Sequence, residues 1–189
     1  VLVKGSAYTE MGISKGAFES FTNNVSDGKN IYVVYEDGSV NKYTPNSKNI
    51  LKFTKDYDSQ KQLKNHFKNF TNGVESEFVA YSPVYSGGYI YFVVDCNLKT
   101  FSMNYENPSV VYASQSALVK LNVSNGKMYY TAINNSLLHP TVAVYNGNPY
   151  LVGGYDTSTN SLSKTMYKYS SGKWTKLCSL PSARAYGKC

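Results

Sequence analysis

Residue types that could carry out catalysis are scarce in this sequence. It contains two histidines, His66 and His139, and 12 acidic residues, many of them in turn-like segments. Zinc-protease, nucleophile-elbow, P-loop and dinucleotide-binding motifs are all absent from it. His66 lies in a helix-like segment and His139 directly precedes a proline, so a structural part is the simpler interpretation of each. We therefore predict no catalytic residue, no metal site and no cofactor.

The three cysteines, Cys96, Cys178 and Cys189, do not form a recognisable metal or disulfide pattern. Their number is odd, and no two of them have the close spacing of zinc and redox motifs. Two interpretations stay open. Cys178 and Cys189 could form a disulfide in an oxidising compartment, or the cysteines could be small buried hydrophobic residues or free thiols.

The formal net charge is +7, and Arg184 is the only arginine in the chain. Nucleic-acid-binding proteins usually depend on arginine for bidentate contacts, so we do not expect a nucleic-acid partner. One mild lysine cluster, Lys61, Lys64 and Lys68, indicates either a solvated surface or an acidic partner. No apolar run reaches the roughly 18 residues of a membrane-spanning helix. The compartment stays undetermined, with an extracellular or surface location favoured.

Composition favours a folded, β-rich domain. Hydrophobic residues make up 42% of the chain and charged residues 16%, which is enough apolar surface to offset chain entropy. Tyrosine is unusually frequent, at 19 of 189 residues. It suits strands, because its ring packs on the pleated surface while its hydroxyl reaches water, and it also supplies contact area in binding sites.

Short apolar runs alternate with glycine-containing turns along the chain. Glycine supplies the positive φ that hairpin turns need, so each turn predicts a β-hairpin. The runs after four of the turns resemble one another, which indicates an internal repeat. Because these runs are nearly unbroken, we expect strands buried on both faces. The four runs are Asn30–Tyr35, Tyr89–Val94, Lys127–Ala132 and Asn148–Gly154.

The spacing between the corresponding glycines is uneven. Gly28 and Gly87 lie 59 residues apart, Gly87 and Gly126 lie 39 apart, and Gly126 and Gly147 lie 21 apart. The second interval predicts one group of four short strands. The third interval is too short for four strands. Either this set of strands is truncated, or the strands there are aligned to the repeat in a different register. The four strands of the second interval are expected at 78–85, 89–95, 98–104 and 109–113.

The first glycine interval is long enough to contain an insertion. Within residues 57–70, the apolar residues Leu63, Phe67 and Phe70 recur at helical spacing. This pattern predicts a short amphipathic helix, whose apolar side we expect to cover the edge of a sheet.

The most specific pattern lies in residues 139–187. Four strands are expected there, at 141–145, 150–152, 166–169 and 173–177, with a polar loop at 156–161. A glycine pair, Gly153 and Gly154, ends the second strand. Tyr169 lies on the third strand and Trp174, the only tryptophan, on the fourth. The segment closes with a Leu-Pro-x-x-Arg sequence that contains Pro181 and Arg184.

Together these features resemble a kelch repeat, and each has a physical purpose. The glycine pair allows backbones to approach where a side chain would clash. Tyr169 and Trp174 are large rings able to fill the space between neighbouring blades. Pro181 stiffens the connection to the next blade, and we expect Arg184 to donate hydrogen bonds to backbone carbonyls at a blade junction. The resemblance covers about a quarter of the chain. In the remainder, only the recurrence of tyrosines and turn glycines matches.

The resemblance implies an all-β fold, a kelch-type β-propeller with four-stranded antiparallel blades, partial or few-bladed. Residues 1–189 would form a single domain or a fragment of one, and the start without methionine and the end at Cys189 favour a part of a larger propeller. A β-sandwich built from the same hairpins is the alternative fold.

Fold resemblance does not determine function. We expect a non-catalytic recognition or scaffold module that binds protein or glycan through its loops, with exposed tyrosines gathered on one loop face. The alternative is a structural component of a larger surface, secreted or virion protein. A copper enzyme resembling galactose oxidase is the third hypothesis, disfavoured because only two histidines are present and the tyrosine–cysteine motif of that family is not found.

Overall fold

The structure is a computed structural model that describes residues 23–48, 50–102, 109–134 and 137–185. Its fold is all-β, as predicted, and consists of four antiparallel sheets. The described sheets do not close into a barrel or a ring. No helix in the described part of the chain has the length and apolar character needed to cross a membrane.

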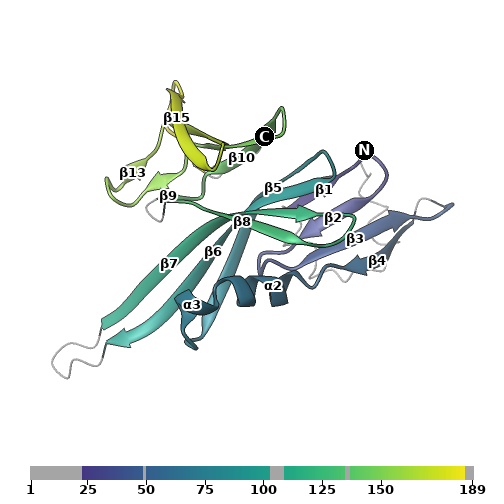
Figure 1. Cartoon of the computed structure of the whole chain (residues 1–189), viewed down its shortest axis with the longest axis horizontal. Coiled ribbons are helices and arrows are strands. Elements are labelled where there is room, and N and C mark those ends of the chain that lie inside the picture. The colour runs from purple at the N-terminus through teal and green to yellow at the C-terminus, as the bar shows by residue number, and fades with distance from the viewer. Residues whose placement is uncertain (1–22, 49, 103–108, 135–136, 186–189) are drawn as a thin grey trace.

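Three of the sheets are four-stranded meanders, in which the strands lie side by side in the order in which they occur along the chain (Figure 1). The first sheet comprises β1 (Asn24–Ser26), β2 (Ile31–Val34), β3 (Val40–Pro45) and β4 (Leu51–Asp56). The second comprises β5 (Ser76–Ser86), β6 (Tyr89–Ser102), β7 (Ser109–Asn122) and β8 (Met128–Ala132). The third comprises β10 (Thr141–Tyr145), β11 (Asn148–Val152), β14 (Thr165–Ser170) and β15 (Lys173–Ser179).

A small three-stranded sheet lies beside the third sheet and interrupts its meander. It comprises β9 (Leu137–Leu138), β12 (Tyr155–Asp156) and β13 (Ser161–Leu162). The four strands expected in residues 139–187 are present as β10, β11, β14 and β15. The expected polar loop at 156–161 instead connects a short hairpin, because β12 pairs with both β13 and β9.

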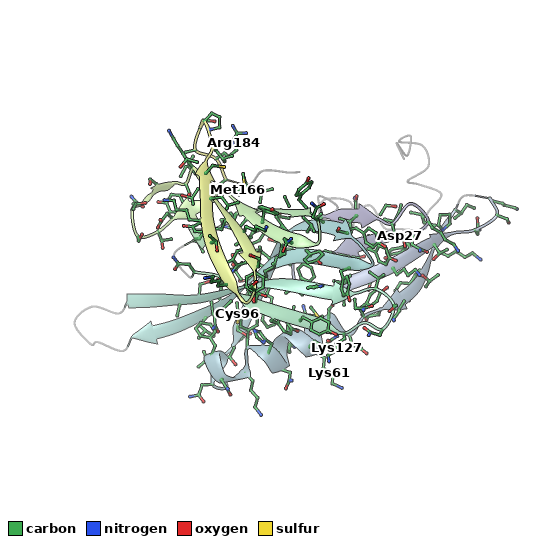
Figure 2. All side chains as sticks on the ribbon, turned by 45° about the horizontal axis from the view of Figure 1, so that its top comes forward. Asp27, Lys61, Cys96, Lys127, Met166 and Arg184 are labelled. Carbon is green, nitrogen blue, oxygen red and sulfur yellow. The ribbon has the colours of Figure 1, made fainter. Side chains whose placement is uncertain are left out.

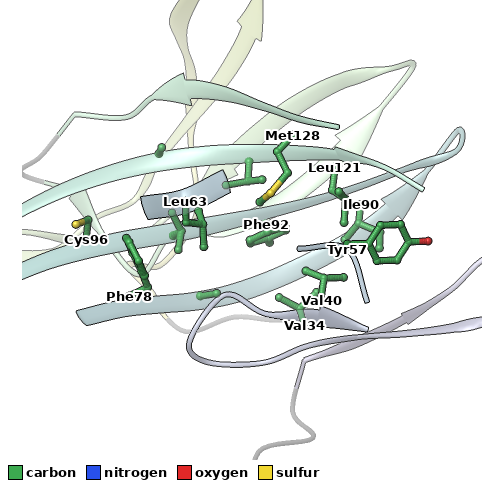
Figure 3. Packing of buried hydrophobic residues seen from close by; sticks show 14 of the residues in the cluster. Val34, Val40, Tyr57, Leu63, Phe78, Ile90, Phe92, Cys96, Leu121 and Met128 are labelled. Atoms are coloured by element: carbon green, nitrogen blue, oxygen red, sulfur yellow. The ribbon is translucent and has the colours of Figure 1, made fainter. Parts of the chain in front are cut away.

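The second sheet is the middle layer, and its two faces form two separate interfaces. One face of β6, including Ile90, Phe92 and Val94, packs against the first sheet (Figure 3). The other face, including Tyr91 and Val93, packs against the third sheet. All five side chains are buried, so the unbroken apolar run of this strand does mark burial on both faces.

Two short helices close the first interface, as the spacing of apolar residues predicted. They are α2 (Ser59–His66) and α3 (Lys68–Thr71). Leu63 and Phe67 are fully buried against the second sheet, and Phe70 is half-buried. The insertion is therefore part of the core, and its apolar side contacts a sheet face and not merely an edge.

Of the four short strands expected between 78 and 113, the first is confirmed, because 78–85 lies within β5. The next two are wrong, because they form one continuous strand, β6, and the last is only the beginning of β7. Two long strands, β6 and β7, pair without interruption from Tyr89–Asn122 to Ser102–Ser109. No break occurs between residues 95 and 98, where Asp95 and Asn97 lie opposite Ser116 and Ser114 and accept hydrogen bonds from their hydroxyls. The strand therefore continues through them. The part of the expected strand 98–104 beyond Ser102 lies outside the described residues.

The glycine spacing looked uneven because Gly126 was wrongly treated as equivalent to the glycines of the other turns. Gly126 lies in the turn between β7 and β8, the third and fourth strands of its sheet. Gly28, Gly88 and Gly147 each lie between a first and a second strand, with φ of 86°, 84° and 72°. These three are 60 and 59 residues apart. The repeat is therefore regular, and the run Lys127–Ala132 is a fourth strand and not a second.

Candidate functional site

The glycine pair lies at a close backbone approach. Gly153 has a φ of 67°, and a Cβ added to it would lie 2.2 Å from the carbonyl oxygen of Arg184. At Gly154, with a φ of 105°, an added Cβ would lie 2.8 Å from the carbonyl oxygen of Leu138. Gly154 N donates to the Arg184 carbonyl oxygen at 2.8 Å. Only glycine fits such positions without strain.

Trp174 lies at the interface between the second and third sheets, and Tyr169 lies beside it in the third sheet. They pair across β14 and β15, with ring centroids 5.1 Å apart. Trp174 is half-buried against the core of this interface, and its Nε1 donates to the carbonyl oxygen of Ala132 at 2.9 Å. The ring therefore joins the outermost strand of the third sheet to the end of β8.

Pro181 and Arg184 follow the third sheet in an exposed connection. Among the described residues, the side chain of Arg184 donates to Ser182 Oγ at 2.7 Å and to no backbone carbonyl, so the expected contact of its guanidinium is not found there. Its backbone supplies the junction contact instead, because its carbonyl oxygen accepts from Gly154 N. Figure 2 shows Arg184 at the tip of this part of the molecule.

The expected cluster of exposed tyrosines on a loop face is not found among the described residues. Of the tyrosines whose burial is described, only Tyr129 and Tyr145 are exposed, and both lie within strands. The others are buried or half-buried, and most of them pack in the two interfaces, as Tyr32 does against Tyr85 in a stacked pair. Most of the tyrosine excess therefore serves packing.

The histidines and cysteines take structural positions. His66 stacks on Tyr130, with ring centroids 3.8 Å apart, and burial lowers its pKa. His139 has a φ of 50° and its N–H donates to Tyr81 Oη. Cys96 is buried in the first interface and Cys178 is exposed on β15. Cys189 lies outside the described residues, so the disulfide prediction stays a prediction.

One buried carboxylate lies at the second interface. Asp95 on β6 is 3% exposed and accepts hydrogen bonds from Ser116 Oγ at 2.6 Å and Tyr81 Oη at 3.3 Å. Burial raises the pKa of Asp95, while the Ser116 hydrogen bond, the charge of His139 and the Tyr81 hydrogen bond lower it. Ser116 Oγ and Tyr81 Oη donate to Asp95, and Tyr81 Oη also accepts from the N–H of His139. These hydrogen bonds connect β5, β6 and β7 to the chain segment that enters β10.

A polar groove lies at the opposite side of the second sheet, between β4, α2 and the β7–β8 turn. Its cavity volume is about 650 Å³, within the range of small-ligand sites. Lys61 marks it in Figure 2. We call this site the groove. It is lined by Lys55, Asp56, Tyr57, Asp58, Lys61, Gln62, Asn65, Asn125 and Gly126.

The inner wall of the groove is fixed by hydrogen bonds to segments distant in sequence. Gln62 Nε2 donates to the carbonyl oxygens of Tyr57 and Gly126, and its Oε1 accepts from Met128 N. Tyr57 Oη donates to the Val123 carbonyl oxygen at 2.9 Å. Burial, with the charge of Asp27 adding to it, raises the pKa of Tyr57 to about 12, so this hydroxyl stays protonated at neutral pH.

Gly126 allows the turn to approach this wall. Its φ is 79°, and an added Cβ would lie 3.3 Å from the ring of Tyr57 and 3.8 Å from Lys55 Nζ. Lys55 Nζ lies 4.6 Å from the centroid of the Tyr57 ring, a cation–π contact. One ammonium group is thereby held at the wall of the groove.

Sequence reasoning did not find the groove. It placed many acidic residues in turn-like segments and Lys61 in a mild lysine cluster, and it had no signal that placed the β7–β8 turn beside α2. No protein-family model matches the chain, and no curated protein matches it.

Proposed function

We propose that the chain is a non-catalytic recognition scaffold that binds a protein or glycan partner in the groove. The single observation that carries this proposal is the wall of Tyr57 and Gln62, whose side chains are fixed by hydrogen bonds to distant segments of the chain. A preorganised site loses less entropy on binding than one that must order its side chains. Its position on a loop and a turn is also where rigid folds usually place binding residues.

We further propose that the three meanders are blades of a kelch-type β-propeller. Three observations support this. The first strands of successive sheets are neighbours, because β5 contacts both β1 and β10. The turns between first and second strands recur at a regular spacing. Finally, a glycine pair at a close approach ends the second strand of the third sheet, with Trp174 at the interface with the preceding sheet.

Chemical-shift mapping tests the recognition proposal. Isotope-labelled protein would be titrated with soluble oligosaccharides and with candidate protein partners. We expect perturbations confined to residues 55–65 and 125–127. Perturbations that map consistently to another surface would overturn the assignment of the groove. The absence of any perturbation across the ligand panel would count against recognition altogether.

A structural part in a larger assembly is the second candidate function, because apolar side chains lie uncovered on the outer sheets. Phe53 on β4 is 58% exposed, and Tyr145 and Leu177 of the third sheet are 68% and 45% exposed. Sedimentation velocity of Phe53→Ser and Tyr145→Ser variants checks this candidate. A reversible assembly that both substitutions dissociate would favour it, whereas a monomer at all concentrations would argue against self-assembly.

That the protein is not an enzyme stays a prediction. A metal assay on the purified chain is the direct check on the copper-oxidase hypothesis, and stoichiometric copper with a tyrosine radical signal would overturn the non-catalytic proposal.

A further inference from the structure

We infer that the ligand of the groove is a neutral, hydroxyl-rich glycan segment. The inference rests on the proposed function and concerns its ligand class. It comes from the polar groups at the rim of the groove, the number that are already hydrogen-bonded, and the charges they carry.

The wall and the rim of the groove have different roles. Both polar atoms of the Gln62 side chain are already occupied by Tyr57, Gly126 and Met128, so Gln62 shapes the site and has little capacity to bind a ligand. The rim is different. The side chains of Asp58, Lys61 and Asn65 are exposed and make no hydrogen bond to any residue that the structure describes.

Two more rim residues are only partly engaged. Asp56 Oδ1 accepts from the N–H of Asp58, which leaves Oδ2 for a ligand. Asn125 Oδ1 accepts from Lys127 N, which leaves its amide N–H groups as donors. The rim therefore offers both hydrogen-bond acceptors and donors to a ligand.

The charges of the groove cancel. Lys55 and Lys61 supply two positive charges, and Asp56 and Asp58 supply two negative charges. A polyanionic ligand would approach two carboxylates, and a polycationic ligand would approach two ammonium groups, so electrostatic complementarity disfavours both.

Sugar hydroxyls fit this arrangement, because each hydroxyl is at once a donor and an acceptor. A chain of vicinal hydroxyls can therefore satisfy carboxylate, amide and ammonium groups in one site. A folded protein partner is a poorer match, because a standard protein interface is far larger than this cavity.

Three substitutions test the groove, its surroundings and its charge. Asn65→Ala removes a rim amide from an exposed position of α2, where alanine favours the helix. Asn69→Ala makes the same change on exposed α3, outside the lining of the groove, and is the matched control. Lys61→Gln removes one charge and keeps a hydrogen-bond donor.

The probe is an array of immobilised neutral, sialylated and sulfated oligosaccharides, followed by calorimetry with the best soluble one. We expect binding to neutral oligosaccharides that Asn65→Ala weakens about three- to tenfold, the loss of one hydrogen bond. Asn69→Ala should change the affinity by less than about twofold, and added salt should have little effect. Lys61→Gln keeps a hydrogen-bond donor at the rim and should weaken binding no more than Asn65→Ala does.

Binding restricted to sialylated or sulfated probes, with loss in Lys61→Gln and in high salt, would overturn the neutral class and leave the groove as the recognition site. Binding to no glycan, with shift perturbations in the groove by a protein partner, would likewise overturn only the ligand class. Neutral-glycan binding that Asn65→Ala leaves unchanged would overturn the groove itself and with it the proposed function.

Discussion

The two interfaces of the second sheet differ in the number and kind of side chains that form them. The first interface, toward the first sheet and the helices, contains sixteen buried residues in the described chain, with Phe92, Leu63 and Phe67 among the largest. The second interface, toward the third sheet, contains six. It adds half-buried rings such as Trp174 and a buried carboxylate, Asp95.

This difference indicates where stability and positioning come from. Apolar burial stabilises roughly in proportion to its area, so the first interface is the main source of folding free energy. The second interface depends more on directional contacts, which specify how the third sheet sits against the second. We expect the second interface to open before the first, and Trp174, as the only tryptophan, reports on it.

The largest expected effect comes from Phe92→Ala in the first interface. Phe92 is fully buried, so its truncation should lower the free energy of unfolding by about 3–5 kcal/mol. Urea unfolding followed by far-UV circular dichroism measures the change. Leu151→Ala in the second interface is the comparison, with an expected cost of about 2–3 kcal/mol. An equal or larger cost for Leu151→Ala would contradict the ranking of the two interfaces.

Gly153→Ala should cost about 2–4 kcal/mol, because the added Cβ meets the Arg184 backbone and φ is positive. Gly172→Ala has a similar φ of 80° but open space around the added Cβ, so it should cost only about 1–2 kcal/mol. Thermal unfolding of both variants separates the close approach from the backbone conformation. Equal costs would mean that the junction with Arg184 is not tightly packed.

Trp174→Phe should cost about 1 kcal/mol, because phenylalanine keeps most of the ring contact and loses the hydrogen bond to Ala132. In the wild-type protein, the urea transition followed by tryptophan fluorescence should precede the one followed by circular dichroism. Coincident transitions would show that the second interface does not open by itself.

The smallest effects distinguish two carboxylates with opposite pH dependence. Burial raises the pKa of Asp95 above 3.8, so its ionisation costs stability as the pH rises through that pKa. Asp95→Asn should therefore be neutral or stabilising at pH 7, within about 1 kcal/mol.

Asp27 lies in the β1–β2 turn and behaves in the opposite way. Although burial raises its pKa, hydrogen bonds from Asn30, Lys29 and Tyr32 outweigh it and hold the pKa well below 3.8. The stabilisation that Asp27 provides is present above 3.8 and lost as the pH falls. Asp27→Asn should cost about 1 kcal/mol at pH 7 and little in acid. Unfolding free energies of both variants across the acidic range check the two signs, and a shared sign would refute the assignment.

Local patterns predicted several elements well. The helical spacing of Leu63, Phe67 and Phe70 located the helices, and the turn glycines located the hairpins, because both signals depend on neighbouring residues. Prediction failed between residues 95 and 98, where two separate strands were expected and one continuous strand, β6, is present. Asp95 and Asn97 accept hydrogen bonds there from Ser116 and Ser114 of β7, and only the pairing of β6 with β7 shows that they are satisfied.

The groove could not have been predicted, because its wall joins segments more than 60 residues apart in sequence, Gln62 with Gly126 and Met128. Similarly, the side chain of Arg184 was expected to contact backbone carbonyls, whereas in the described chain it donates to Ser182 and the Arg184 carbonyl oxygen accepts from Gly154 N.

By itself, the sequence determined the all-β class, the helical insertion, the hairpin turns and the positions where only glycine fits, since each follows from the conformational preferences of a few adjacent residues. The tertiary structure alone decided which glycines are equivalent, which face of β6 meets which sheet, and where a polar cavity forms. Those outcomes depend on contacts between distant segments, and the geometry of such contacts exists only once the sheets have packed.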